Sequence, residues 1–325
     1  MSTTVPRRFL LTAAASLALP RLALAQDFPA RPIRLLIGAP PGSAPDVAAR
    51  LMADRLSTLW RQPVVIDNRP GANGNLAAQI TAQAPGDGHT LLFAQASILL
   101  LNEWLMRNPG YDTDRDFVAI TQLMATPFML GVRKDSPVST LAELVAAGKA
   151  APGRITFATT SGANLPRFAG ELLKRAAGFD MTNVPYSTTA GAIQDALMGR
   201  TDLMIDGTPV IAPQVRGGQM KALALTSLRR FPGMEEIPVV AESYPGFDSV
   251  GWFGLVGPKA MPPALVARIA QDFRGVLEVP EVKERLLRDF GAEVIASPPD
   301  AFASYLARER ATYRALVREV GVTLE

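Results

Sequence analysis

The sequence predicts an α/β protein with two lobes, and three observations support this fold class. Downstream of Gln26, short β-rich runs alternate with longer stretches in which apolar residues have helical spacing. Strand, helix and strand follow one another repeatedly, which is the order of a parallel sheet with right-handed crossovers. The 325 residues, 48% hydrophobic and 19% charged, suffice for two globular domains at about 150 residues each.

The first predicted elements occupy residues 33–94. Ile33 to Gly38 is an apolar run typical of a buried strand, and Pro40-Pro41-Gly42-Ser43 follows it as a turn. From Asp46 to Leu59, apolar residues at helical spacing predict a helix. The other elements expected here are a strand over 64–67, a helix from about 76 to 84 and a strand over 90–94.

Residues 117–134 form a long extended run that contains Pro127. Because proline interrupts a central sheet ladder, we expect two strands that meet at a hinge. The elements expected after it are helices over 140–150, 165–177 and 190–198, strands over 155–158, 183–185 and 203–206, and extended segments over 221–226 and 252–258. Three helices, near 264–277, 281–290 and 299–320, complete the chain. The predicted organisation is lobe 1 over 26–125 and 227–325, and lobe 2 over 126–226.

Residues 1–25 are typical of a secretory signal peptide. Arg7-Arg8 precedes an apolar run from Phe9 to Leu19, and Ala23-Leu24-Ala25 is a small-x-small cleavage site. We therefore expect cleavage after Ala25 and export to the periplasm, by either the twin-arginine or the general secretory route. The leader holds three of the 33 basic residues and none of the 30 acidic ones, so the rest of the chain is formally neutral. Its charge does not predict a nucleic-acid partner.

The residue inventory excludes several classes of chemistry. The chain has no Cys and a single His, so disulfides, cysteine nucleophiles and multi-histidine zinc sites are excluded. It contains no G-x-S-x-G motif. His89 follows Gly86-Asp87-Gly88, a turn, where a histidine usually has a structural role at the surface. We expect no catalytic residue, no metal and no cofactor.

Several predicted strands are followed by loops rich in glycine and hydroxyl residues, at 38–46, 94–98, 159–164 and 187–191. In open parallel sheets, ligands bind at the carboxyl ends of the strands, where helix N-termini present backbone N–H groups and a partial positive charge. Loops of this kind on two lobes would face a common cleft. The pattern favours an anionic ligand, above all a carboxylate.

A set of motifs in fixed order resembles one protein family. The motifs are PARPIRLLIGAPPGSAPDVAARLMADRL at 29–56, QPVVIDNRPGANGNLAAQ at 62–79, APGDGHTLLFA at 84–94, AGELLKRAAG at 169–178, NVPYSTTAGAIQDALMGRTDLMID at 183–206 and SVGWFGLVGP at 249–258, with Tyr111-Asp112 and Arg115-Asp116-Phe117 between them. Together they are similar to the Bug family of extracytoplasmic solute receptors, the binding components of tripartite tricarboxylate transporters. The resemblance covers nearly all of the chain after the leader.

This resemblance implies a type II periplasmic-binding-protein fold, in which two α/β lobes close over a small organic acid. It also implies that backbone amides and hydroxyls of the lobe loops hold the ligand. Carried over by position, the ligand-binding residues are Pro41, Gly42, Ser43, Ala96, Ser97, Thr160, Ser161, Gly162, Ala163, Asn164, Thr188, Thr189, Ala190 and Asp206. The implied partners are a di- or tricarboxylate, aromatic acid or acidic amino acid, and the subunits of a membrane transporter.

The chain departs from the family pattern in the binding loops. Ala39 and Ser43 replace an aromatic residue and a glycine that are common in the family, and Ser187-Thr188 replaces a lysine and a glycine. These differences affect the identity of the ligand more than the fold.

Individual side chains have a functional and a structural interpretation. For Asp206, at a strand end, we favour ligand binding. For Asp46, near a helix start, we favour a structural role, and for Arg167 a solvent-facing one. Trp252 and Phe253 are more consistent with core packing than with stacking on a ligand. Two other functions stay open: a ligand sensor for a signalling partner, which would use the same fold, and a small-ester hydrolase, which the residue inventory disfavours.

Overall fold

The computed structural model describes residues 28–160 and 164–321. The first part comprises β1 (Ile33–Ile37), α1 (Ala44–Trp60), β2 (Val64–Asn68), the 3-10 turn η1 (Ala72–Gly74), α2 (Asn75–Ala82), β3 (Thr90–Gln95), α3 (Ala96–Leu100), α4 (Asn102–Leu105), α5 (Thr113–Asp116) and β4 (Phe117–Arg133). The middle part comprises α6 (Leu141–Ala150), β5 (Thr156–Thr159), α7 (Leu165–Ala177), β6 (Thr182–Pro185), α8 (Thr189–Leu197), β7 (Leu203–Gly207), α9 (Thr208–Arg216), β8 (Met220–Leu225) and α10 (Val240–Ser243). The last part comprises β9 (Val250–Pro258), α11 (Pro263–Leu277), α12 (Pro280–Phe290), β10 (Glu293–Val294) and α13 (Pro299–Val320).

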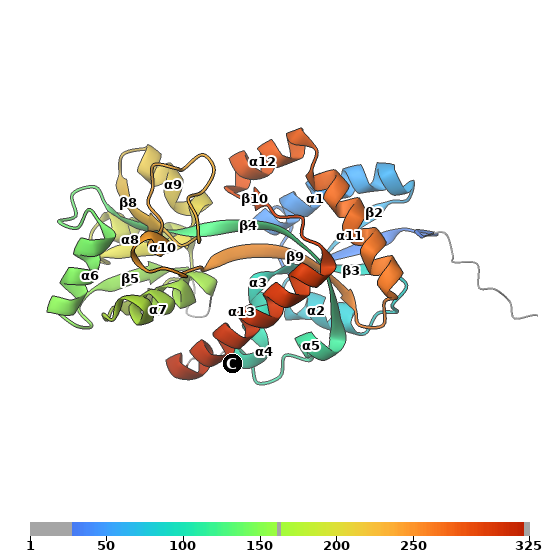
Figure 1. The fold of residues 1–325 in the computed structure, drawn as a ribbon, viewed down its shortest axis with the longest axis horizontal. Helices are drawn as coiled ribbons and strands as arrows, with labels where there is room; N and C mark the ends of the chain where they lie inside the picture. Colours follow the sequence, from blue (N-terminus) through green and yellow to red (C-terminus); the bar gives the residue numbers. More distant parts are fainter. Residues whose placement is uncertain (1–27, 161–163, 322–325) are drawn as a thin grey trace, which may run out of the picture.

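The strands are connected in the order β2-β1-β3-β9-β4-β7-β5-β6, with β8 and β10 also paired to β4. β1 lies parallel to β2 and β3, and β5 lies parallel to β6 and β7, as the strand–helix–strand order predicts. β4 and β9 are antiparallel to their neighbours and to each other. Figure 1 shows these two strands running between two halves of the molecule. The first half carries α1 and α11, and the second half carries α6 and α7.

The prediction of two strands meeting at Pro127 is wrong, because β4 is one continuous strand of 17 residues. Pro127 lies opposite Val250, in the last pair of the β4/β9 ladder, and the pairing of β4 with β7 begins at the next residue, Phe128. The proline therefore stands where the strand exchanges its partners. It interrupts no continuous ladder at this position, so the strand can pass through it.

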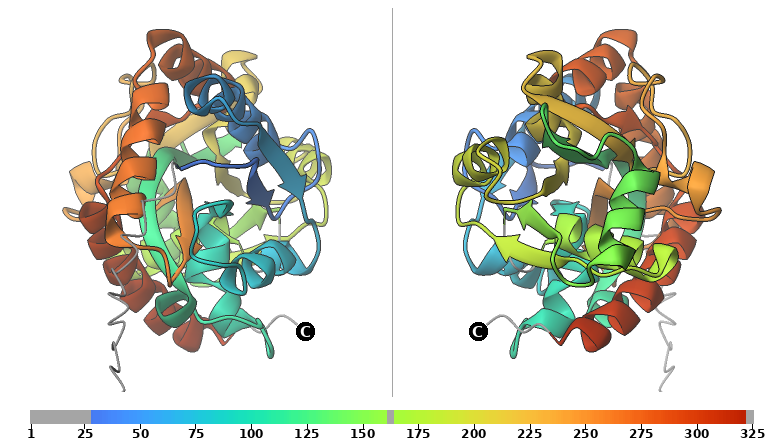
Figure 2. Two further views of the ribbon diagram at one scale, coloured as in Figure 1. Left: turned by 90° about the vertical axis from the view of Figure 1, so that its right-hand side faces the viewer. Right: turned by 90° about the vertical axis from the view of Figure 1, so that its left-hand side faces the viewer.

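Helices enclose the strands in both halves, as the end-on views in Figure 2 show. In the first half, β1, α1 and α11 share one buried cluster that includes Leu35, Met52 and Phe273. A larger cluster extends from α2 and α3 to α7 and α13 and so belongs to both halves. Within it, the Tyr313 ring of α13 lies edge-on to Phe168 of α7, with 6.2 Å between the ring centroids. The C-terminal helix thus joins the two halves.

Sequence periodicity did not predict several short or irregular elements, namely α3, α4, α5, α9, α10 and β10. It also misplaced His89, whose side chain is buried instead of lying at the surface. The imidazole packs edge-on against Phe28, with 5.3 Å between the ring centroids. Neither ring nitrogen has a hydrogen-bond partner among the described residues. Among these residues, no helix combines the length and apolar character needed to cross a membrane.

Candidate functional site

A cavity of about 420 Å³ lies where elements of the two halves meet. Its volume is in the range of small-molecule sites in proteins. The lining residues come from α1, β3, α3, β4, α7, β7, α9, β9 and α12, and from the residues next to them. They are Ala44, Gln95, Ala96, Ser97, Thr126, Phe128, Asn164, Leu165, Pro166, Asp206, Gly207, Pro209, Val210, Gly251, Trp252, Phe253, Asp289, Phe290 and Ala292.

Within the described residues, four helices begin at this cavity. Ala44, Ala96 and Leu165, the first residues of α1, α3 and α7, line it, and Gly207 and Pro209 line it on either side of the first residue of α9. No side chain caps the N-termini of α1, α3 and α9. Each helix N-terminus leaves backbone N–H groups without intrahelical partners and carries about half a positive charge. The cavity wall is therefore suited to an anion.

Four of the residues predicted from sequence meet in this cavity: Ala96 and Ser97 from the first half, and Asn164 and Asp206 from the second. Ser97 is half-buried at the start of α3. The strand-end rule accounts for this convergence, because β3 and β7 run toward the junction from opposite halves, and Ala96 and Asp206 lie at their carboxyl ends.

The predicted loop at 40–43 lies next to the cavity but does not line it, and its polar groups bond to one another. The Gly42 amide donates to Asp46 Oδ2 at 2.8 Å, and the Ser43 hydroxyl donates to the Pro40 carbonyl at 2.6 Å. Asp46 also accepts hydrogen bonds from the Arg50 guanidinium and from Asn68. Burial acts to raise the pKa of Asp46, but these donors together hold it below its usual value. The Asp46 carboxylate thus holds the loop in place, a structural role.

The predicted residues of the second half are placed differently from one another. Thr160 is not a lining residue, and its hydroxyl donates to Asp206. Asn164 caps α7 by accepting from the Arg167 amide at 3.1 Å. Thr188 is the exposed N-cap of α8, followed by Thr189 and Ala190, and this helix start does not line the cavity. The remaining predictions, Ser161, Gly162 and Ala163, lie outside the described residues.

The ionisable side chains that line the cavity are both acidic, and no Lys or Arg is among the lining residues. Asp206 is 8% exposed, whereas Asp289 lies at the exposed end of α12 and pairs with Arg288. Backbone dipoles are thus the positive element of this site. Among the described residues, no group of three or more His, Cys, Asp or Glu side chains is placed to hold a metal ion.

Comparison with known proteins identifies the family. Residues 48–322 match the family model described as tripartite tricarboxylate transporter family receptor. The chain belongs to this receptor family. It is 31% identical to BugT of Bordetella pertussis over 303 residues, covering 93% of both chains.

Solved structures give the same assignment. R. palustris Rpa4515 with adipate is 30% identical, with a TM-score of 0.76 over 91% of this chain and 99% of that one. MatC from Rhodopseudomonas palustris with bound malate is 29% identical, with a TM-score of 0.70 over 89% and 100% of the two chains. The predicted α/β periplasmic-binding-protein fold is therefore confirmed. The family consists of binding receptors, so the prediction that the chain is not an enzyme is also confirmed.

Several lining residues of the receptor's cavity were not predicted from sequence, and many of them come from the crossing strands and from the end of α12. Besides Trp252 and Phe253, they are Ala44, Gln95, Thr126, Phe128, Leu165, Pro166, Gly207, Pro209, Val210, Gly251, Asp289, Phe290 and Ala292. Aromatic side chains also line the cavity, among them Trp252 and Phe253 of β9. Trp252 is buried against Phe302 and Tyr305 of α13, as predicted, but Phe253 is only half-buried and packs beside Phe93. Both residues lie within the SVGWFGLVGP motif, which is the one sequence signal that marks this part of the cavity wall.

Two polar residues considered from sequence do not line the receptor's cavity. Arg167 is half-buried in a groove between α7 and α13, beside Glu171 and Lys174, and burial lowers the pKa of its guanidinium. His89 is not among the lining residues either. Neither side chain is placed to act on a molecule in the cavity.

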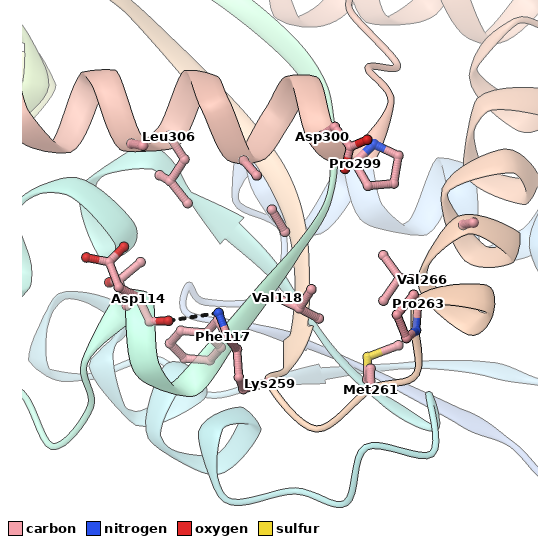
Figure 3. A pocket seen from close by; sticks show the side chains of 15 residues that line it. Asp114, Phe117, Val118, Lys259, Met261, Pro263, Val266, Pro299, Asp300 and Leu306 are labelled. Atoms are coloured by element: carbon pink, nitrogen blue, oxygen red, sulfur yellow. Dashed lines mark hydrogen bonds between the residues drawn. The ribbon is translucent and has the colours of Figure 1, made fainter.

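The receptor has a second cavity of about 420 Å³ on the outside of the first half, between the start of β4, α11 and α13 (Figure 3). Its charged lining residues are Asp114, Lys259 and Asp300, and the Lys259 ammonium donates to the Asp114 carbonyl at 3.0 Å. Most of the surrounding side chains are apolar, such as Phe117 and Leu306. None of the residues predicted from sequence to bind ligand lies in this cavity, so we place the candidate site between the two halves.

Proposed function

We propose that this receptor captures a small organic carboxylate between its two halves and delivers it to a tripartite tricarboxylate-type membrane transporter. The observation that supports this most directly is the convergence of four helix N-termini on a cavity whose lining contains no cationic side chain. Such a site binds an anion through many N–H donors without a full countercharge. Relatives with bound adipate and malate indicate dicarboxylates as the first compounds to examine.

We further propose that binding involves closure of the two halves. β4 is continuous across both, because it pairs with β9 in the first half and with β7 and β8 in the second, and its residues 124–127 lie where its partners change. Rotation at these residues and at 226–227 would bring α1 and α3 toward α7 and α9, because hinge motions concentrate in a few backbone positions.

The first experiment is a thermal-shift screen of adipate, malate, tricarboxylates, aromatic acids and acidic amino acids. A ligand at 100 times its dissociation constant adds about 2.7 kcal/mol of stability, which raises the melting temperature by several degrees. Val210 is a half-buried lining residue, so Val210→Trp places an indole in the space that the ligand would occupy and should weaken binding at least tenfold. Val65→Trp, on the exposed edge strand β2, is the matched control and should leave binding unchanged. If no organic acid shifts the melting temperature, the proposed function is wrong.

For location, we propose export to the periplasm with removal of residues 1–25. The mature protein isolated from that compartment should begin at Gln26, which intact-mass measurement checks. A mass that retains the Phe9–Leu19 run would contradict cleavage after Ala25.

A further inference from the structure

Asp206 is a fixed hydrogen-bond acceptor in the wall of the cavity. It lies near the end of β7 and is 8% exposed. Thr160 Oγ1 donates to Asp206 Oδ2 at 3.0 Å, and the Gly207 amide donates to Oδ1 at 2.7 Å. Asn164 Nδ2 donates in turn to Thr160 Oγ1 at 3.4 Å, which orients the hydroxyl. A carboxylate has about four lone-pair positions, so two acceptor positions of Asp206 have no donor among the described residues.

No cation among the described residues balances this carboxylate. Its strand neighbour on β4 is Met129, and the adjoining start of α7 contributes Asn164, Leu165 and Pro166. The other acidic lining residue, Asp289 of α12, is paired with Arg288. The segment 161–163 is Ser-Gly-Ala and has no ionisable side chain.

This environment raises the pKa of Asp206. Burial is the largest influence and raises its pKa, while the Gly207 amide and the Thr160 hydroxyl act in the opposite direction with less effect. A buried charge without a partner is costly, and a donor supplied by the ligand would reduce that cost. A second ionised carboxylate placed at the same point would increase it.

We infer that Asp206 determines specificity by accepting a hydrogen bond from the ligand. The favoured ligand has a carboxylate that the helix N-termini bind and, at its other end, an ammonium, hydroxyl or amide donor that reaches Asp206. A ligand with an ionised carboxylate at that end is disfavoured. This inference rests on the proposed function, because it states which carboxylates the receptor prefers: those with a hydrogen-bond donor at the other end over those with a second ionised carboxylate.

Matched ligand pairs test the inference by isothermal titration calorimetry at pH 7.5. Adipate is compared with 6-aminohexanoate, and succinate with 4-aminobutanoate, so that one carboxylate is exchanged for a CH2–NH3⁺ group and the ammonium nitrogen takes the place of a carboxylate oxygen. We expect the wild-type protein to bind the better amino acid at least tenfold more tightly than its dicarboxylate. In Asp206→Asn, whose amide is neutral and also donates, we expect this preference to be lost or reversed. Asp54→Asn, which removes an exposed carboxylate of α1 that does not line the cavity, should change both affinities less than threefold.

Each outcome decides the inference. Tighter binding of both dicarboxylates by the wild-type protein overturns it, even if Asp206→Asn does not fold. A preference that Asp206→Asn leaves intact also overturns it, while the proposed function stands. If none of the four compounds binds, the inference is wrong, and the wider acid screen decides separately whether the proposed function is wrong too.

Discussion

We expect the replacement of Arg310 by methionine to lower the free energy of unfolding by about 3 kcal/mol. Arg310 is 6% exposed, and its guanidinium donates to the Leu99 carbonyl at 2.8 Å and pairs with Glu103 at 3.1 Å and Asp114 at 3.0 Å. It also lies over the Trp104 ring, 4.9 Å from the centroid. Removing one partner of a buried pair leaves the other charge unbalanced, which costs about 3–5 kcal/mol; we use the lower end because Asp114 is exposed.

Urea unfolding of both proteins measures this effect. Arg308→Met is the matched control, because Arg308 lies on the same helix with an exposed side chain, 5.8 Å from the Tyr305 ring centroid. We expect the control to lose less than 1 kcal/mol, the usual magnitude for an exposed cation–π contact. A loss below 1 kcal/mol for Arg310→Met would show that the ion pairs do not hold α13 to α3, α4 and α5.

The position of Arg310 also bears on closure of the receptor. α13 is tied to the first half through Arg310, and three residues later Tyr313 bonds to Ser249 at 3.1 Å and contacts Phe168 of α7. A helix fixed to one half and packed against the other limits the directions in which the halves can rotate. We therefore expect substitutions at Tyr313, which contacts both halves, to affect both stability and the path of the proposed closure, whereas Arg310 contributes by fixing α13 to the first half.

Sequence reasoning located those parts of the site that follow strand ends. Ser97 and Asp206 each come directly after or at the end of an apolar run, and local patterning suffices to place them at the edge of a sheet. The helix that begins at Ala44 was also predicted, from Asp46 onward, although Ala44 itself was not among the predicted ligand-binding residues. In these cases the information lies within a few residues of the position predicted.

The parts that sequence reasoning missed depend on contacts between distant segments. Gly251 reaches the cavity because β9 pairs with β4, more than 100 residues earlier in the chain, and Phe128 lies beside Gly207 because β4 pairs with β7. Phe290 reaches it because α12 ends beside α9, where Thr208 Oγ1 donates to the Gly291 carbonyl at 3.4 Å. His89 is buried for the same kind of reason, since Phe28 packs over it. No local pattern carries these pairings.

The contribution of Glu309, on α13, to the stability of the receptor should fall as the pH rises from about 4.5 to 7. Glu309 and Asp248 line one groove between α13 and the segment before β9. Burial, together with repulsion from Asp248, raises the pKa of Glu309 to about 7, against the opposing effect of Arg308. The folded protein therefore binds this proton more tightly than the unfolded chain, so the contribution of Glu309 to stability is greatest below pH 4.5 and is lost as the pH rises through 7.

Comparison of wild type with Glu309→Gln isolates this contribution, because the glutamine cannot ionise. We expect equal stabilities at pH 4.5 and an advantage of about 2 kcal/mol for the variant at pH 8, less than the full shift implies because Glu309 is partly exposed. Urea unfolding at intervals between these pH values traces the difference. Glu319→Gln removes an exposed charge from the same helix and should change stability by less than 0.5 kcal/mol at every pH. A difference between wild type and Glu309→Gln that does not vary with pH would mean that Glu309 releases its proton as readily in the folded protein as in the unfolded chain.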